Sequence, residues 1–330
     1  MKILVTGSAG HLGEALMRTL RAEGQQVVGT DILPSNFTDF VGSIADRTHV
    51  RKCMAGVDAV LHTATLHKPH VATHTRQDFV DTNISGTLNL LEEATLAGVS
   101  AFIYTSTTSA FGDALTPRPD EPAAWITEEV PPVPKNIYGV TKVAAENLCA
   151  LFYRNQRLPC LILRTSRFFP EPDDSKATRD AYADANSKAN EFLYRRVDIE
   201  DIVAAHLLAV QKAPAIGFGR YIISATTPFM PADLAELRAD APAVVKRLFP
   251  QYAAAYAQRG WRMFPSIDRV YVNTRARTEL GWQPRYDFAH ILAQLNAGHA
   301  DLRSPMARLI GCKGYHAEVF DEGPYPVAAH

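Results

Sequence analysis

Three glycines follow the first apolar run of this sequence and constrain its fold more than any other feature. Residues 3–6 have the composition of a buried strand, and Gly7, Gly10 and Gly13 come directly after them. Glycines at this spacing let the backbone turn tightly and approach a pyrophosphate, which the N-terminus of a following helix can hold. A tight strand–helix turn without any ligand would use the same glycines, so the trio alone does not establish a nucleotide site.

The rest of the chain alternates between apolar runs and helical patterns. After residues 3–6, strand-like runs rich in Val, Ile and Leu occur at residues 27–31, 59–64, 102–106, 161–165 and 220–224. Helical patterns occupy residues 12–23, 83–97, 138–153, 231–248 and 288–295, and Pro-rich loops are expected at 117–134, 169–172 and 213–214. Strands that are apolar throughout and separated by helices indicate a parallel sheet covered on both faces, and right-handed crossovers make it doubly wound. We therefore predict an α/β fold of the Rossmann type.

The pattern becomes more broken after residue 165. We predict a nucleotide-binding Rossmann domain in residues 1–165, which also receives later segments at about 195–225. Residues 166–330 are expected to form a small, discontinuous C-terminal substrate lobe and a tail.

The composition excludes several classes of protein. The 330 residues carry a formal net charge of −1 without a strongly basic run, which argues against nucleic acid as the main partner. No stretch reaches the ~20 uncharged apolar residues that a membrane helix needs. The four cysteines are widely spaced and form no Cys-x-x-Cys pair, which is typical of reduced thiols. The first strand begins at once, which leaves no room for a signal peptide, so we expect a cytoplasmic protein.

Asp31 stands at the end of the second strand-like run. An acidic residue at this place can accept hydrogen bonds from an adenosine ribose, and its charge would repel a 2′-phosphate. Asp31 could equally be an ordinary turn residue at a strand end. Together with the three glycines it favours a dinucleotide site that takes NAD rather than NADP.

Tyr138 and Lys142 are one helical turn apart and therefore lie on the same face of a helix. An ammonium group beside a phenol favours the phenolate and lowers the pKa of the phenol. Such a tyrosine can move a proton on or off a hydroxyl group. The same spacing also arises by chance on solvated helix faces, so its weight depends on the glycine-rich loop.

Ordered motifs along roughly residues 1–295 resemble the extended short-chain dehydrogenase/reductases of the NAD-dependent epimerase/dehydratase family. The likeness begins with Thr-Gly-Ser-Ala-Gly-His-Leu-Gly at 6–13 and includes Tyr-Gly-Val-Thr-Lys at 138–142. The other matching motifs lie at residues 62–64, 83–91, 105–112, 196–201 and 280–284.

This resemblance implies a role for each matching residue. Thr107 would hydrogen-bond the reacting oxygen, with Thr108 as an adjacent rival. Tyr138 would carry the proton, while Lys142 would lower the pKa of Tyr138 and bind the nicotinamide ribose. The expected cofactor residues are Gly7, Gly10, His11, Leu12, Gly13, Asp31, Ser43, Ile44, His62, Ala64, Asn83, Tyr138 and Lys142. Ser43 stands where the family usually has Asp.

The resemblance to this family also bears on the size of the substrate. Arg167 occupies the place where sugar-nucleotide members usually carry an Asn that grips the diphosphate, and residues 171–194 are shorter than their nucleotide-binding insert. The run at 164–172 also resembles that of uronate dehydrogenases. A substrate smaller than a nucleoside-diphosphate sugar is therefore expected. The candidate substrate residues are His67, His70, Thr108, Ser166, Arg167 and Arg196.

Two features leave alternatives open. His67, His70 and His74 lie close together, but Pro69 breaks the helix that would align them and no carboxylate or Cys lies between them, so we expect no metal site. The family likeness places this loop over the substrate pocket, although exposed loop histidines would look the same. The tail at 301–330 lies beyond the family pattern and could either cap the pocket or wrap the surface.

These observations predict an NAD-dependent oxidoreductase that acts on a hydroxyl of a sugar or sugar acid. The alternatives are an epimerase or dehydratase that acts on nucleotide sugars and retains its NAD, and a non-catalytic NAD-binding regulator. We also expect a homodimer formed by the helices at 83–97 and 138–153, with Leu88, Leu91, Leu148 and Leu151 at the contact.

Overall fold

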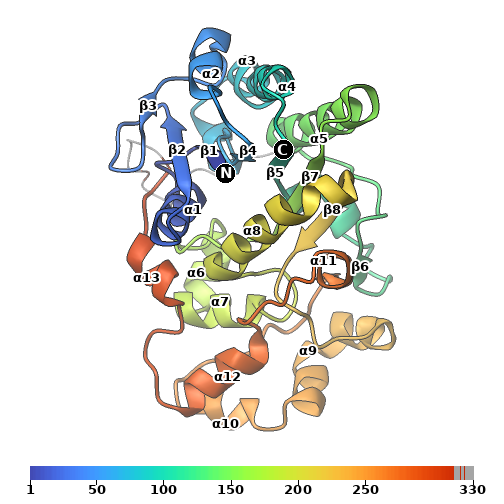
Figure 1. Cartoon of the computed structure of the whole chain (residues 1–330). Helices are drawn as coiled ribbons and strands as arrows, with labels where there is room; N and C mark the ends of the chain where they lie inside the picture. Colours follow the sequence, from blue (N-terminus) through green and yellow to red (C-terminus); the bar gives the residue numbers. More distant parts are fainter. Residues whose placement is uncertain (316–319, 321–322, 324–330) are drawn as a thin grey trace.

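A computed structural model describes residues 1–315, 320 and 323 of the chain. Its centre is a parallel sheet with the strand order β3-β2-β1-β4-β5-β7-β8 (Figure 1). The strands are β1 (Lys2–Thr6), β2 (Gln26–Asp31), β3 (Phe40–Val41), β4 (Ala59–His62), β5 (Ala101–Thr107), β7 (Cys160–Thr165) and β8 (Phe218–Ile223). The Rossmann-type α/β fold predicted from the sequence is confirmed.

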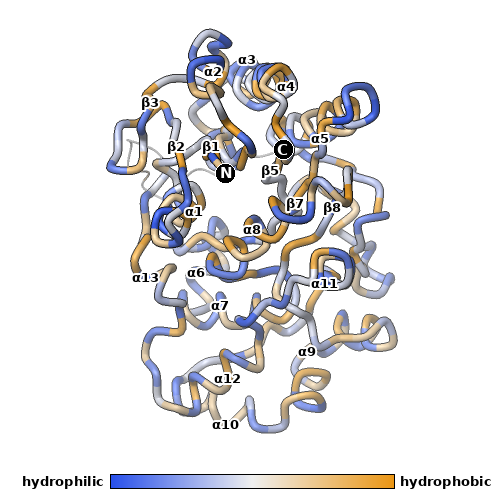
Figure 2. The backbone as a smooth tube through the Cα atoms, in the orientation of Figure 1, coloured by the Kyte–Doolittle hydropathy of each residue, from blue (hydrophilic) through white to orange (hydrophobic). Residues whose placement is uncertain are grey.

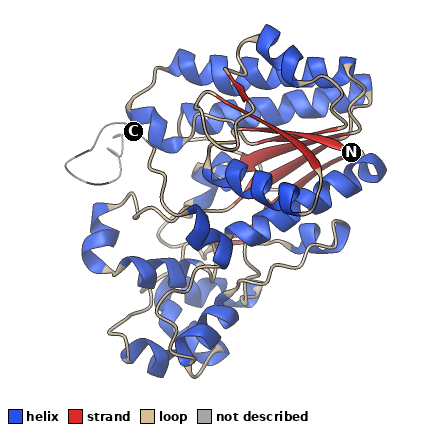
Figure 3. Cartoon of the chain, turned by 60° about the vertical axis from the view of Figure 1, so that its left-hand side comes forward, coloured by secondary structure: helices blue, strands red, loops and turns tan. Residues whose placement is uncertain are grey.

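Both faces of this sheet are buried under helices, which is why the centres of its strands are mostly apolar (Figure 3). One face packs on α1 (His11–Ala22), α8 (Ile199–Ile216) and α13 (Pro305–Ile310). The other packs on α2 (Arg47–Cys53), α4 (Gly86–Leu96) and α5 (Ile137–Gln156). Side chains of β1 point alternately to the two faces of the sheet. Ile3 and Val5 pack in the core beneath α1 and α8, whereas Leu4 packs in the core beneath α2 and α4. Hydrophilic and hydrophobic residues alternate along the helices in Figure 2, as is typical of helices that bury one face on a core.

A further hydrophobic core lies around Phe229, Tyr256 and Phe288. It is built largely by α7 (Asp184–Glu191), α9 (Leu234–Leu248), α10 (Tyr252–Ala257) and α12 (Phe288–Asn296), which occupy the lower part of Figure 1. The short strands β6 (Ala124–Ile126) and β9 (Arg269–Tyr271) pair beside it. The division of the chain into two domains at residue 165 stays a prediction.

The remaining short elements connect these layers. They are the α-helices α3 (Arg76–Phe79), α6 (Lys176–Ala181) and α11 (Thr274–Glu279), the 3-10 turns η1 (Lys68–Ala72), η3 (Thr108–Phe111), η4 (Asp113–Leu115) and η5 (Pro231–Asp233), and the π-helical turn η2 (Val80–Ser85). No helix among the described residues is long and apolar enough to cross a membrane.

Three details differ from the sequence-based expectations. The loop expected at 213–214 is wrong, because α8 continues through Pro214 and ends before Gly217, whose φ is 78°. A proline in a last helical turn removes only one backbone hydrogen bond. The helix expected at 231–248 is interrupted at Asp240, whose carboxylate accepts from the Ala243 amide and caps the second half. Leu91 lies fully buried in the protomer's own core, so it cannot belong to a dimer contact.

Candidate active site

The candidate site lies where four neighbouring strands end. Parallel strands place their carboxyl ends at one edge of a sheet, so the loops that follow β1, β4, β5 and β7 start side by side. In open α/β sheets, ligands bind in the crevice outside these ends.

The glycine-rich loop after β1 needs its glycines for two different reasons. Gly7 has a φ of 71°, in the left-handed region that residues with a side chain avoid. A methyl group added at Gly13 would collide with the Gly7 carbonyl, so only glycine lets the first turn of α1 pack this closely. The Gly10 amide donates to the Gly7 carbonyl at 3.0 Å, and α1 begins at His11. This cradle fits the pyrophosphate of a dinucleotide.

The Asp31 carboxylate fixes the opposite wall of this cradle. One of its oxygens accepts from the Ala9 amide at 3.0 Å, and the other accepts from the Leu33 amide at 2.9 Å. Because an ionised carboxylate has about four acceptor positions, two remain for the hydroxyl groups of a ribose. Ser43 accepts from the Ala45 amide through its hydroxyl, and the Ile44 side chain is buried beneath Gly86.

The His62 side chain is engaged by the loops around it. Thr6 Oγ accepts from the Thr63 and Ala64 amides, so its own hydrogen goes to His62 Nδ1 at 2.8 Å. The proton of the ring is therefore on Nε2, which donates to the Thr87 hydroxyl at 2.9 Å. Burial, with the Lys142 charge nearby, lowers the pKa of His62 to about 3 and keeps the ring neutral. With both ring nitrogens engaged, the expected cofactor contact at His62 can come only from its backbone.

Asn83 similarly braces the loop that follows β4. Its side-chain oxygen accepts from the Leu66 amide at 2.8 Å and the Thr65 hydroxyl at 3.0 Å. Its amide nitrogen donates to the Leu66 carbonyl and to the hydroxyl of Thr141, which lies in α5. Asn83 thus ties this loop to the helix that carries Tyr138.

Tyr138 and Thr107 lie together at the end of β5. Burial raises the pKa of the Tyr138 phenol to about 12, and a hydrogen bond with the Thr107 side chain opposes that rise. Thr108, the adjacent rival, directs its hydroxyl toward the Thr165 carbonyl at 3.5 Å. Of the two threonines, the structure therefore brings Thr107 to the phenol.

Lys142 is buried one turn along α5, and its ammonium contacts the end of β5. It donates to the Thr105 carbonyl at 2.6 Å and lies 4.2 Å from the centre of the Tyr104 ring. Burial lowers the pKa of Lys142 to about 7, although the negative charge of Glu146 raises it. The ammonium can therefore gain and lose its proton near neutral pH.

Glu146 is a site residue that sequence reasoning missed. Its carboxylate, buried one turn beyond Lys142, accepts from Ser106 Oγ at 2.7 Å and from two nitrogens of Arg164 at 2.7 and 3.0 Å. Arg220 adds a longer contact at 3.3 Å. Glu146 thus ties α5 to β5, β7 and β8 directly behind Thr107 and Tyr138. The four-residue spacing from Lys142 was the available signal.

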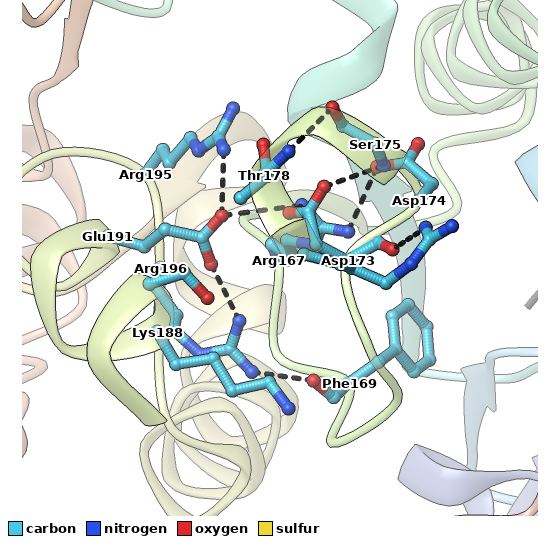
Figure 4. Close-up of polar contacts among 12 residues, drawn as sticks. Arg167, Phe169, Asp173, Asp174, Ser175, Thr178, Lys188, Glu191, Arg195 and Arg196 are labelled. Atoms are coloured by element: carbon cyan, nitrogen blue, oxygen red, sulfur yellow. Dashed lines mark hydrogen bonds and ion pairs between the residues drawn. The ribbon is translucent and has the colours of Figure 1, made fainter. Parts of the chain in front are cut away.

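Arg167 does not have the setting expected of a substrate clamp. Its guanidinium pairs with Asp173 at 2.5 Å, Asp174 at 3.2 Å and Glu191 at 3.3 Å (Figure 4). These carboxylates hold its charge in place against the cost of burial and raise its pKa. An arginine already surrounded by three carboxylates is a weak receptor for an acidic substrate, so the expected clamp at Arg167 is not supported.

Arg196 is likewise engaged within the protein. It donates to Glu191 at 2.8 Å and to the Phe169 carbonyl at 2.5 Å (Figure 4). Ser166 differs from both arginines, because its buried hydroxyl has no hydrogen-bond partner in the described part of the chain. It follows the last residue of β7 and remains a candidate substrate contact.

The histidines expected over the pocket form a compact cluster. His67 and His70 pack edge to face with ring centres 4.7 Å apart, and His70 packs in the same manner against His74 at 5.2 Å. Among the described residues, no group of three His, Cys, Asp or Glu side chains could hold a metal ion.

Comparison with known proteins places these motifs in context. The model of the NAD dependent epimerase/dehydratase family matches residues 3–223. A UDP-glucose 4-epimerase of Rhizobium meliloti is 28% identical over 88% of this chain and 94% of its own length. The chain spans only 39% of an uncharacterized protein, y4nG, of Sinorhizobium fredii, to which it is 32% identical over 49% of its own length.

Solved structures agree on the fold. A short-chain dehydrogenase/reductase superfamily protein from Agrobacterium tumefaciens, solved with bound NAD, matches 90% of this chain and 96% of its own with a TM-score of 0.65 and 25% identity. The UDP-N-acetylglucosamine 4-epimerase of Bacillus cereus matches 91% of this chain and all of its own with a TM-score of 0.62 and 20% identity, a likeness of fold alone.

Proposed function

Because the chain belongs to the NAD dependent epimerase/dehydratase family, we propose that it uses NAD to oxidise a hydroxyl-bearing carbon of a sugar or sugar acid. The observation that carries this proposal is the buried Tyr138 phenol, hydrogen-bonded with Thr107 and one helical turn from Lys142. A protein that only bound NAD would have no use for this set. The likeness to an NAD-bound relative and the cradle between Gly7 and Asp31 support NAD as the cofactor.

Each side chain of the set has a distinct task in this proposal. NAD, when bound, supplies the acceptor for the hydride. Thr107 orients the substrate oxygen, and Tyr138 receives its proton as general base. A phenol with a pKa of about 12 holds its own proton at neutral pH, so a positive charge must lower that pKa. We assign this task to Lys142, which the structure buries on the same helix face.

A second candidate is an epimerase, in which the hydride returns to the substrate. The likeness to the Rhizobium meliloti UDP-glucose 4-epimerase runs along most of both chains and favours this candidate. Both reactions begin with the same oxidation and make the same demands on Thr107, Tyr138 and Lys142. They differ in whether NADH accumulates and in whether the substrate carries a nucleotide.

One assay separates the two candidates. The purified protein is incubated with NAD and a panel of free sugars, sugar acids and UDP-sugars, and both NADH and isomeric products are measured. Net NADH formation supports the dehydrogenase, whereas an isomer without NADH supports the epimerase. If no substrate in the panel yields either NADH or an isomer, the proposal is contradicted. The Tyr138→Phe variant is the control, because it removes only the phenol oxygen.

A further inference from the structure

Aromatic rings from distant parts of the chain meet above the end of β5. His67, from the loop after β4, stacks on Phe169, from the loop after β7, with ring centres 5.4 Å apart and planes at 17°. Because β4 and β7 flank β5 in the sheet, this stack bridges the strand end where Thr107 lies. His11, the first residue of α1, packs edge to face on Phe169 at 5.2 Å. The rings thus form a roof over the crevice assigned to cofactor and substrate.

The C-terminal segment at residues 312–315 closes the outer side of this roof. The ring of Tyr315 packs edge to face against His67 at 4.9 Å and against Phe169 at 5.7 Å. His70 accepts from the His67 amide through Nδ1, so its Nε2 carries the proton and donates to the Tyr315 carbonyl at 3.1 Å. Tyr315 is therefore joined to both loops that flank β5.

Glu171 holds this segment in place. A single carboxylate oxygen accepts from His11 Nε2 at 2.7 Å and from the backbone amides of Lys313 and Gly314 at 3.0 and 3.1 Å. The other oxygen accepts from the Tyr315 hydroxyl at 3.3 Å. Burial alone would raise the pKa of Glu171, but these partners, His11 first, lower it to about 2, so it stays ionised at any working pH.

Lys313 fastens the same segment to the glycine-rich loop. Its ammonium donates to the Ala9 carbonyl at 2.9 Å and to the Glu14 carboxylate at 2.5 Å. The segment therefore makes contacts with the nucleotide loop, the loop after β4 and the loop after β7.

We propose that Tyr315 is a specificity-determining residue that forms the outer wall of the substrate pocket, and that Glu171 is the positioning residue that holds it there. This inference rests on the proposed function and narrows its substrate class. A wall that joins the loops after β4 and β7, and that Lys313 fastens to the glycine-rich loop, lies across the crevice between these three loops. The pocket then takes a single carbohydrate ring, whose apolar face lies against the aromatic rings, and excludes a sugar that carries a nucleoside diphosphate.

Three variants test the wall, and a fourth serves as the control. Tyr315→Ala removes the ring, Tyr315→Phe keeps it, and Glu171→Ala releases the segment. Leu309→Ala changes an exposed residue of α13 that contributes nothing to the roof. Each variant is assayed for KM and kcat with the preferred free sugar, for the Kd of NAD by calorimetry, and for activity with the corresponding UDP-sugar.

Removal of the wall should affect substrate binding more than chemistry. Tyr315→Ala should raise KM for the free sugar about tenfold with kcat nearly unchanged, the pattern of lost uniform binding. It should also allow the UDP-sugar to react, whereas Tyr315→Phe and Leu309→Ala should behave like the wild type. An unchanged KM in Tyr315→Ala would overturn the proposal, and a lowered KM would show that the ring blocks the pocket instead of lining it.

Hydrogen exchange tests the attachment without any substrate. The amides of Lys313 and Gly314, which donate to Glu171, should exchange faster in Glu171→Ala and at the wild-type rate in Leu309→Ala. Equal exchange in Glu171→Ala and the wild type would overturn the positioning role. If the wild type oxidises no carbohydrate, the proposed function fails. The hydrogen-exchange comparison, together with calorimetric titration of sugars into the wild type and Tyr315→Ala, still decides whether the wall exists.

Discussion

Replacement of Glu146 by Gln should destabilise the protein strongly although the two side chains have nearly the same shape. The Glu146 carboxylate and the Arg164 guanidinium are both almost fully buried and share two hydrogen bonds of 2.7 and 3.0 Å. In the variant, the amide group of Gln must turn an N–H donor toward one of the two Arg164 nitrogens, because each carboxylate oxygen of Glu146 accepts from one of them. Arg164 then keeps its charge in a buried site without its hydrogen-bonded carboxylate, and breaking a buried pair in this way costs about 3–5 kcal/mol.

The expected loss can be measured as a change in melting temperature. With an unfolding entropy of about 2.1 cal/mol/K per residue, that cost corresponds to a fall in Tm of about 4–7 °C for a chain of this length. The matched control is Glu236→Gln, because Glu236 pairs with Arg247 at 2.6 Å on the surface, where ion pairs contribute little. Calorimetric scans of the wild type and both variants give the comparison. If Glu146→Gln lowers Tm no more than Glu236→Gln does, the assignment of Glu146 as a buried anchor behind the active site is refuted.

Four other perturbations test the site and the assembly. Tyr138→Phe should lower kcat by about 10²–10⁴-fold with an unchanged Kd for NAD in calorimetry, since only the proton carrier is lost; a wild-type rate would contradict this. Lys142 has a pKa of about 7 in the folded protein against 10.5 for the ordinary side chain. Between about pH 7 and pH 10.5 the unfolded state therefore binds more protons than the folded state, and the free energy of unfolding should rise with pH in this range. Urea unfolding should show that rise, at most about 1.4 kcal/mol per pH unit, in the wild type and not in Lys142→Met. Asp31→Asn should improve the affinity for NADP relative to that for NAD. If calorimetry finds the same ratio of the two Kd values in the variant and the wild type, the carboxylate does not select the cofactor. Light scattering should find a homodimer, and Leu151→Glu, which changes an exposed residue of α5, should shift it toward the monomer; a monomeric wild type would contradict the expected dimer.

Local sequence patterns predicted the sheet and the centre of the site, because both depend on short-range rules. A strand buried on both faces is mostly apolar, as Ile3–Val5 in β1 and Leu161–Leu163 in β7 are, and a Tyr–Lys pair one turn apart must share a helix face.

Features that depend on distant partners could not be predicted in this way. The pairing of β6 with β9 joins Trp125 to Val270, and three-residue strands carry little periodicity. Arg167 was expected to bind substrate because it occupies the place of the diphosphate-binding Asn of sugar-nucleotide members. Its three carboxylate partners are recognisable only in the folded chain. The contact between Glu171 and residues 313–315 is hidden for the same reason.

The packing of α13 against α1 has a consequence for how the protein is made. Ile310 completes the core that contains Leu16 and Leu20 of α1, although almost 300 residues separate the two helices in the chain. During synthesis, the first helix therefore leaves the ribosome long before its last packing partner exists. Such non-local contacts slow folding and leave apolar surface exposed in the meantime. Nascent chains that do not yet contain α13 should consequently depend on chaperones until that helix has emerged and packed on α1.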